Sequence, residues 1–104
     1  MQERAHPISP DIENLIKATV RESMQRFGLR EVCVRAGEDH DGDPVIFIEA
    51  EYVLSETPID TEITTALATI LRDRLWEKGE TRFPHIRHKF HERQQVKPRR
   101  KVRA

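Results

Sequence analysis

Two short stretches of the chain contain residues that could ligate a metal ion, and the first runs from Asp39 to Asp43. Three aspartates and a histidine surround Gly42 there. A calcium-binding helix–loop–helix motif requires glycine at the sixth position of its loop and glutamate at the twelfth. Counted from Asp39, these positions hold Pro44 and Ala50. The run is therefore interpreted as a hairpin turn, for which Asp and Gly are favoured residues.

The second stretch places three histidines, His85, His88 and His91, at intervals of three residues. Zinc sites often include a thiolate or a carboxylate, and no cysteine lies nearby in the sequence. The surrounding arginines and lysines would also repel a bound cation. These histidines are interpreted as residues of an amphipathic strand, with a pH-sensitive patch as the alternative because histidine titrates near neutrality. The sequence predicts no metal site and no cofactor.

Candidates for catalysis are few. Cys33 stands between Val32 and Val34 and is expected to be a buried, small apolar residue. Glu49 and Glu51 are two residues apart, so a strand would place both carboxylates on one face. Acid–base chemistry also requires a pocket that separates the pKa values of such a pair, and a small open sheet offers little concavity. The sequence therefore predicts a protein that is not an enzyme.

The charges of the chain are divided into two blocks that cancel. Segment 37–62 has nine acidic residues and no lysine or arginine, whereas segment 82–104 has nine basic residues and one acid. The formal net charge of zero thus conceals about −9 in one segment and about +8 in the other. Such a chain could bind a cationic surface, an anionic surface or a second copy of itself, or it could neutralise itself on folding.

The length of 104 residues leaves room for one domain with one core. The single cysteine excludes an intrachain disulfide and fits a reducing compartment. The N-terminus lacks the apolar segment of a secretory signal, and no stretch approaches the ~18 apolar residues of a membrane span. A small bacterial-type cytoplasmic protein is predicted.

Two amphipathic helices are predicted. The first begins at residues 9–11, where serine caps, proline suits the first turn and aspartate complements the helix dipole. Its apolar residues recur every three or four positions as far as Phe27, and Gly28 fits the position after its end. The second helix is expected to begin with Thr57 as its cap and to end at Gly79.

Three strands are predicted from alternating apolar and polar residues, over 31–36, 45–54 and 83–90. The Asp41-Gly42 pair between the first two is a strong hairpin signal, so these strands should be antiparallel. The connection through the second helix should run the third strand parallel to the second. The third strand could lie beside the second strand or beside the first.

The element order α-β-β-α-β predicts an α+β fold. It is a two-layer sandwich in which two helices cover one face of a small three-stranded sheet, made of the antiparallel hairpin and the C-terminal strand. Residues 1–8 are expected to be a flexible N-terminus, residues 9–93 a single domain and residues 94–104 a disordered basic tail.

Without catalytic residues, the chain is predicted to act by binding. We expect a non-enzymatic regulatory module of the antitoxin, inhibitor or small-subunit type, which contacts another protein. A homodimer is compatible with the charge pattern, and neither a membrane nor a small-molecule substrate is expected. The expected contact surface is the exposed sheet face, where opposite charges on neighbouring strands can pair. Its residues are Phe47, Glu49, Glu51, Arg87 and Lys89.

The alternative partner is a nucleic acid, bound by the basic C-terminal segment. Five cations follow Gln94, in a stretch without helical or strand periodicity. They could neutralise several phosphates, or they could fold onto a protein partner. These tail residues are Lys97, Arg99, Arg100, Lys101 and Arg103.

Overall fold

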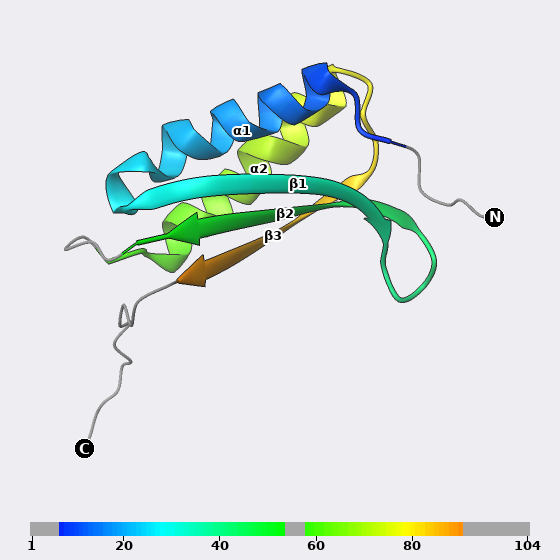
Figure 1. Cartoon of the computed structure of the whole chain (residues 1–104). Coiled ribbons are helices and arrows are strands. Elements are labelled where there is room, and N and C mark those ends of the chain that lie inside the picture. Colours follow the sequence, from blue (N-terminus) through cyan, green and yellow to red (C-terminus); the bar gives the residue numbers. More distant parts are fainter. Residues whose placement is uncertain (1–6, 54–57, 91–104) are drawn as a thin grey trace.

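Two helices cover one face of a three-stranded sheet (Figure 1). The computed structural model describes residues 7–53 and 58–90. The predicted α+β two-layer sandwich is confirmed. In chain order, the elements are α1 (Pro10–Met24), a short 3-10 turn (Gln25–Phe27), β1 (Leu29–Glu38), β2 (Pro44–Tyr52), α2 (Thr61–Glu77) and β3 (Phe83–Phe90).

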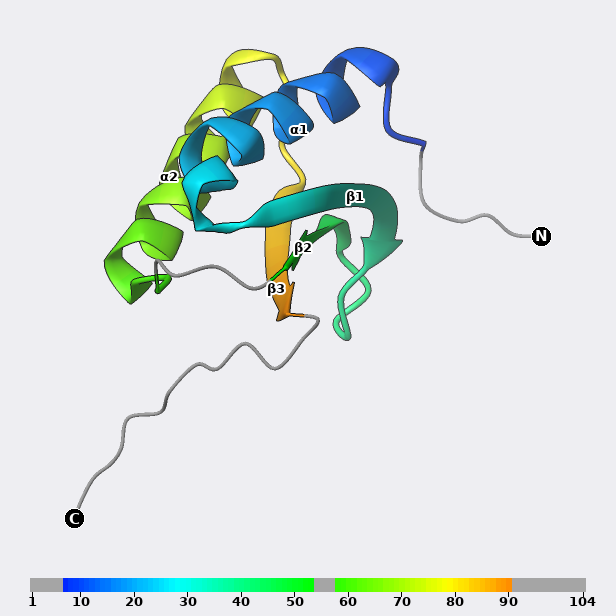
Figure 2. The ribbon, with the colours of Figure 1, turned by 60° about the vertical axis from the view of Figure 1, so that its left-hand side comes forward.

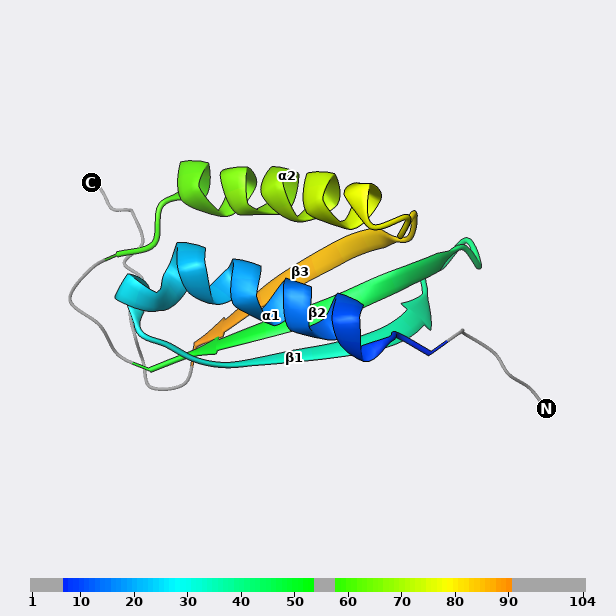
Figure 3. The same cartoon turned by 90° about the horizontal axis from the view of Figure 1, so that it is seen from above.

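The central strand of the sheet is β2, which pairs antiparallel with β1 and parallel with β3. The third strand therefore lies beside the second, which decides between the two positions that the sequence left open. Seen from above, the two helices run alongside each other, with α1 crossing the sheet and α2 on the β3 side (Figure 3). Helix α1 contacts β1, and α2 contacts β3. Parallel strands need such a long crossover, which α2 provides.

The antiparallel hairpin between β1 and β2 turns at the predicted Asp41-Gly42 pair. Gly42 adopts a φ of 87°, which residues with a side chain rarely adopt. The amide of Gly42 donates to the carbonyl of Asp39 at 2.9 Å, and the amide of Asp39 donates to the carbonyl of Asp43 at 3.0 Å. Both strands extend close to this turn, so β1 is longer at each end than the predicted 31–36.

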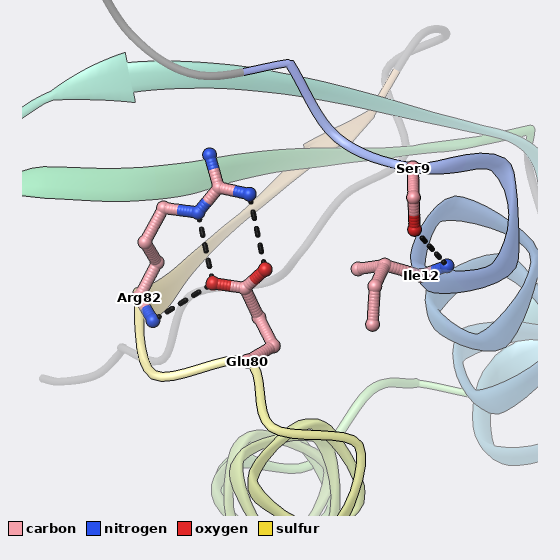
Figure 4. Close-up of polar contacts among 4 residues, drawn as sticks. All are labelled: Ser9, Ile12, Glu80 and Arg82. Carbon is pink, nitrogen blue, oxygen red and sulfur yellow. Dashed lines mark hydrogen bonds and ion pairs between the residues drawn. The ribbon is translucent and has the colours of Figure 1, made fainter.

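The start of α1 follows the prediction. Ser9 is the N-cap, and its hydroxyl accepts a hydrogen bond from the amide of Ile12 at 3.3 Å (Figure 4). Pro10 occupies the first turn, where its missing N–H costs nothing. The helix tightens into the 3-10 turn, and Gly28 follows with a φ of 87°. The left-handed glycine ends the helix as its position predicted.

The predicted start of the second helix is wrong. The helix begins at Thr61, and its N-cap is Asp60, whose carboxylate accepts from the amide of Glu62 at 2.8 Å. Thr57, the predicted cap, lies outside the described residues. Aspartate caps a helix at least as well as threonine, so the later of two adjacent start signals is the one used. The predicted end is confirmed, because Gly79 has a φ of 83° directly after the C-cap, Lys78.

The core lies between the two helices and the inner face of the sheet. The predicted stripe of α1 and the predicted inner residues of β2 are both buried there. None of the described helices is long and apolar enough to cross a membrane. The buried core consists of Ile12, Ile16, Val20, Met24, Phe27, Val32, Ile46, Ile48, Ala50, Tyr52, Leu67, Leu71 and Leu75.

One buried polar contact joins the two helices. Thr19 of α1 is fully buried, and its hydroxyl donates to the carbonyl of Leu15 at 2.8 Å. The same hydroxyl accepts a hydrogen bond from Nη1 of Arg74 in α2 at 3.1 Å. Arg74 also reaches the carboxylate of Glu22 at 3.1 Å, on the outside of the helix pair. The contact fixes how α1 and α2 lie relative to each other.

The loop into β3 is fixed by Glu80 and Arg82. Nε of Arg82 lies 2.8 Å from Oε2 of Glu80 and Nη2 lies 3.0 Å from Oε1, so the pair is bidentate (Figure 4). The amide of Arg82 also donates to Oε2 at 3.0 Å. These bonds to the Arg82 guanidinium and amide lower the pKa of the Glu80 carboxyl. The pair sets the direction in which the chain enters β3.

Candidate protein-binding face

The face of the sheet opposite the helices is not covered by any described element (Figures 1 and 2). Side chains alternate along each strand, so every second residue points to this side. We call this surface the open face. Its residues are Glu31, Cys33 and Arg35 of β1, Phe47, Glu49 and Glu51 of β2, and Phe83, His85, Arg87 and Lys89 of β3.

Two columns of opposite charge lie side by side on the open face. The register pairs Glu49 of β2 with Arg87 of β3, and Glu51 with Lys89. Neighbouring strands are about 4.8 Å apart, so each acid has a cation beside it. The four charged residues predicted for the contact surface therefore do share one face. We call Glu49 and Glu51 the acidic column, and Arg87 and Lys89 the basic column.

Glu49 and Arg87 lie side by side but form no ion pair with each other. Glu49 and Arg87 are adjacent in register, yet neither takes part in an ion pair or a side-chain hydrogen bond within the described part of the chain. Across β2, Glu49 has Cys33 of β1 as its other neighbour. Both charged groups are therefore available to an external partner.

An aromatic–cation row crosses the open face at the end nearest the hairpin turn. The guanidinium of Arg35 lies 4.6 Å from the ring centre of Phe47, which stacks on His85 at 5.7 Å. His85 meets the edge of Phe83 at 5.0 Å, and Arg72 of α2 lies 5.8 Å from the Phe83 ring centre. The row thus connects α2, β3, β2 and β1 through ring contacts.

Gly37 makes room for the centre of this row. A Cβ atom at Gly37 would lie 2.4 Å from Cε2 of Phe47 and 2.7 Å from Cδ2, closer than real contacts allow. The Phe47 ring therefore lies over bare backbone, between Gly37 and the Arg35 guanidinium. Only Phe47 of the row was predicted as a contact residue. Extending the strand alternation to Arg35, Phe83 and His85 would have found the other strand residues, whereas Arg72 of α2 carries no such signal.

The prediction that Cys33 is buried is wrong, because its side chain lies on the open face and is exposed. Its apolar neighbours Val32 and Val34 point to the opposite side, toward the helices. In a strand, a residue between two apolar residues points to the opposite face, so apolar neighbours do not show that it is buried. Partial desolvation and the nearby carboxylates, Glu31 first, raise the pKa of the Cys33 thiol.

The histidines do not converge on a common site. His85 lies on the open face, whereas His88 points toward the helices, and His91 lies outside the described residues. Nδ1 of His88 is 2.6 Å from the hydroxyl of Tyr52, which is fully buried. Burial lowers the pKa of His88 and raises the pKa of Tyr52. The buried tyrosine and the half-buried histidine form a polar pair on the helix side of the sheet.

The carboxylate of Asp39 is used by the hairpin turn itself. Oδ1 of Asp39 accepts hydrogen bonds from the amides of Asp41 at 2.9 Å and Asp43 at 3.0 Å. These bonds, that from Asp43 first, lower the pKa of Asp39. Carboxylate oxygens of the three aspartates come within 4.8 Å of one another. The geometry agrees with the interpretation of this run as turn chemistry.

The predicted tail residues lie outside the described part of the chain, so their prediction is unchanged. They are Lys97, Arg99, Arg100, Lys101 and Arg103.

No protein-family model matches the chain, and no curated protein matches it in sequence. Two solved structures match, both from work on the mode of action of CzrB, a candidate zinc transporter. One is 21% identical, covers 81% of this chain and 98% of its own, and has a TM-score of 0.43. The other, a zinc form, is 16% identical, covers 91% of this chain and 100% of its own, and has a TM-score of 0.45. Similarity at this level supports no conclusion about what this chain binds.

Proposed function

We propose that this protein is a non-enzymatic binding module that contacts a partner protein through its open face. One observation carries the proposal: charged and aromatic side chains stand in ordered rows on a sheet face that no described element covers. Protein interfaces combine aromatic and arginine anchors with a polar, charged surround. The aromatic–cation row supplies the anchors, and the two charged columns supply orientation.

The chemistry of the face supports binding rather than catalysis. A reactive cysteine needs a lowered pKa, which a nearby cation or a helix N-terminus provides. The carboxylates around Cys33 have the opposite effect and keep the thiol protonated at neutral pH. Charges of both signs on one surface favour fast, selective association with a complementary protein, as an antitoxin, an inhibitor or a small subunit requires.

Affinity purification of the tagged full-length chain from its native cell, with nuclease treatment, tests the proposal. Lys89→Glu reverses a charge on the open face, and Arg21→Glu makes the same change on the exposed side of α1. We expect wild type and Arg21→Glu to retain the same proteins after nuclease treatment. Lys89→Glu should retain about fivefold less, because a like-charge contact replaces an attractive one.

Two outcomes would contradict this proposal. Captured material that disappears with nuclease would indicate a nucleic-acid partner. Capture that is lost on removing residues 94–104 but unaffected by Lys89→Glu would assign binding to the basic tail. Both variants should first show the far-UV circular dichroism and thermal unfolding of the wild type, so that a folding defect is recognised.

A further inference from the structure

The open face is complementary to itself. Its acidic column on β2 and its basic column on β3 lie at the same levels along the sheet, because Glu49 pairs in register with Arg87 and Glu51 with Lys89. A second copy turned over onto this face can place its basic column against the acidic column of the first. We propose that two copies of this chain form a symmetric dimer through their open faces. This inference rests on the function proposed above.

The arrangement of the columns selects one symmetry axis. If the two-fold axis runs parallel to the strands, above the boundary between β2 and β3, then β2 of each copy faces β3 of the other. Glu49 then faces Arg87 of the partner subunit, and each such contact occurs twice, as two-fold symmetry requires. An axis centred over β2, or one perpendicular to the strands, would place like charges together, which opposes association.

The same axis brings the aromatic–cation rows together. Phe47 and His85 are in register, so Phe47 of each copy faces the partner's His85. Phe83 leaves 49% of its surface exposed in the single chain and would be covered at the margin of this contact. Facing sheets pack about 10 Å apart, a spacing that side chains of this size fill. The interface therefore combines an aromatic end with a charged end.

Two features of the single chain favour this occupant. Glu49 and Arg87 have no ion-pair partner within the described part of the chain, although each lies beside an opposite charge. An intermolecular contact can satisfy both groups at once. The formal net charge of the chain is also zero, so two copies approach without overall repulsion.

A charge swap between two variants tests this dimer. Glu49→Arg alone places Arg against Arg across the axis, and Arg87→Glu alone places Glu against Glu. When these two variants are mixed, both cross-axis contacts become Arg against Glu. We therefore expect wild type to dimerise in sedimentation analysis over about 1–500 μM, a range suited to a small interface. Each variant alone should be monomeric, and their equimolar mixture should restore dimers.

Controls of equal charge change are available on the helical side. Asp73→Arg matches Glu49→Arg, and Arg21→Glu matches Arg87→Glu, and all four residues belong to described elements. Both controls should dimerise like wild type. Recovery of dimers on mixing also shows that the two face variants are folded, since misfolded chains would not regain a specific contact.

A second readout uses the single cysteine. Cys33 is exposed on β1 of the open face, so a nitroxide can be attached without any substitution. The strand and sheet spacings place the two Cys33 positions of the dimer roughly 18 Å apart. Pulsed electron spin resonance should detect an intermolecular distance near this value in wild type. The distance should be absent from labelled Glu49→Arg and return when it is mixed with Arg87→Glu that is also labelled at Cys33.

The dimer is overturned if wild type stays monomeric, if the mixture stays monomeric, or if both single variants still dimerise. A monomeric wild type whose Lys89→Glu variant still loses captured proteins would leave the open face as the contact for a different protein. If the face variants still dimerise and still capture the same proteins, the proposed function is rejected as well.

Discussion

The centre of the aromatic–cation row depends on the absence of a side chain at Gly37. The Phe47 ring lies where the Cβ of any other residue at position 37 would be, so the pair acts as a unit. A cross-strand aromatic that covers a strand glycine compensates for the packing that glycine lacks. The space that the Phe47 ring needs therefore explains why glycine, an unfavourable strand residue, stands at position 37.

Gly37→Ala should destabilise the protein by about 1 kcal/mol, the lower end of the cost of overpacking. In a Phe47→Ala background the same substitution should be neutral or should stabilise by about 0.5 kcal/mol, because the clash is gone and alanine restricts the unfolded chain. Urea unfolding of the four proteins in a double-mutant cycle measures this coupling. An equal effect of Gly37→Ala in both backgrounds would contradict the contact with Phe47.

The partly buried pair of Tyr52 and His88 predicts how stability depends on pH. Neutral His88 can accept the Tyr52 O–H at Nδ1, and burial lowers the pKa of His88. The unfolded chain therefore binds this proton first, near pH 6.5. Stability from this residue is complete above about pH 6.5 and falls as the pH drops toward the lowered pKa of the folded state.

His88→Asn retains a polar atom near Nδ1 but does not titrate. The free energy of unfolding, measured by urea denaturation between pH 7 and pH 5, should fall less steeply in this variant than in wild type. A slope that is the same in wild type and His88→Asn would assign the pH dependence to other groups.

At the scale of elements, a single buried hydroxyl connects the helices. Arg74 of α2 bonds both Thr19 and Glu22, but these contacts differ in burial. Thr19 is fully buried, whereas the side chains of Arg74 and Glu22 are 41% and 64% exposed. Exposed ion pairs contribute little because water screens them. The contact with Thr19 should therefore carry most of the coupling between α1 and α2.

Thr19→Val removes this hydroxyl with little change of shape and should cost about 1 kcal/mol, typical of a hydrogen bond to a charged or buried group. Glu22→Gln should cost less than about 0.5 kcal/mol. Chemical denaturation of both variants, each also combined with Arg74→Met, separates the two contacts. If Glu22→Gln is the costlier change, the ion pair and not the buried hydroxyl joins the helices.

At the scale of the whole molecule, opposite charges that are far apart in the sequence come together in space. The acidic column of β2 and the basic column of β3 lie side by side on the open face. Charge attraction between copies should therefore depend on salt, while the aromatic contacts should not.

Raising the ionic strength from 0.1 M to 1 M shortens the Debye length from about 10 Å to about 3 Å. Sedimentation analysis of wild type should show a dimer dissociation constant that increases by about tenfold over this range. The increase should be partial, because apolar burial persists at high salt. A dimer that strengthens with salt would indicate an apolar interface elsewhere on the molecule.

Local signals in the sequence were enough to predict the elements and their order. The cap at Ser9 and the glycines with positive φ at Gly28, Gly42 and Gly79 are local signals, and each was predicted correctly. The start of α2 was missed because two capping residues compete within four positions, and local propensity does not rank them. The shared face of Glu49, Glu51, Arg87 and Lys89 could be predicted, since residues alternate between the two faces of a strand, but their register could not.

The sequence predicted that one sheet face would be exposed, but which β1 residues lie on it depended on how the helices pack. Cys33 and Val32 are equally apolar in sequence, and the side on which the helices pack makes one exposed and the other buried. The place of β3 beside β2 followed in the same way, from the path of α2 across the sheet. The aromatic–cation row joins residues 35, 47, 72, 83 and 85 because strand pairing and helix packing bring distant segments into contact. Local sequence signals act over a few residues and contain no information about such contacts.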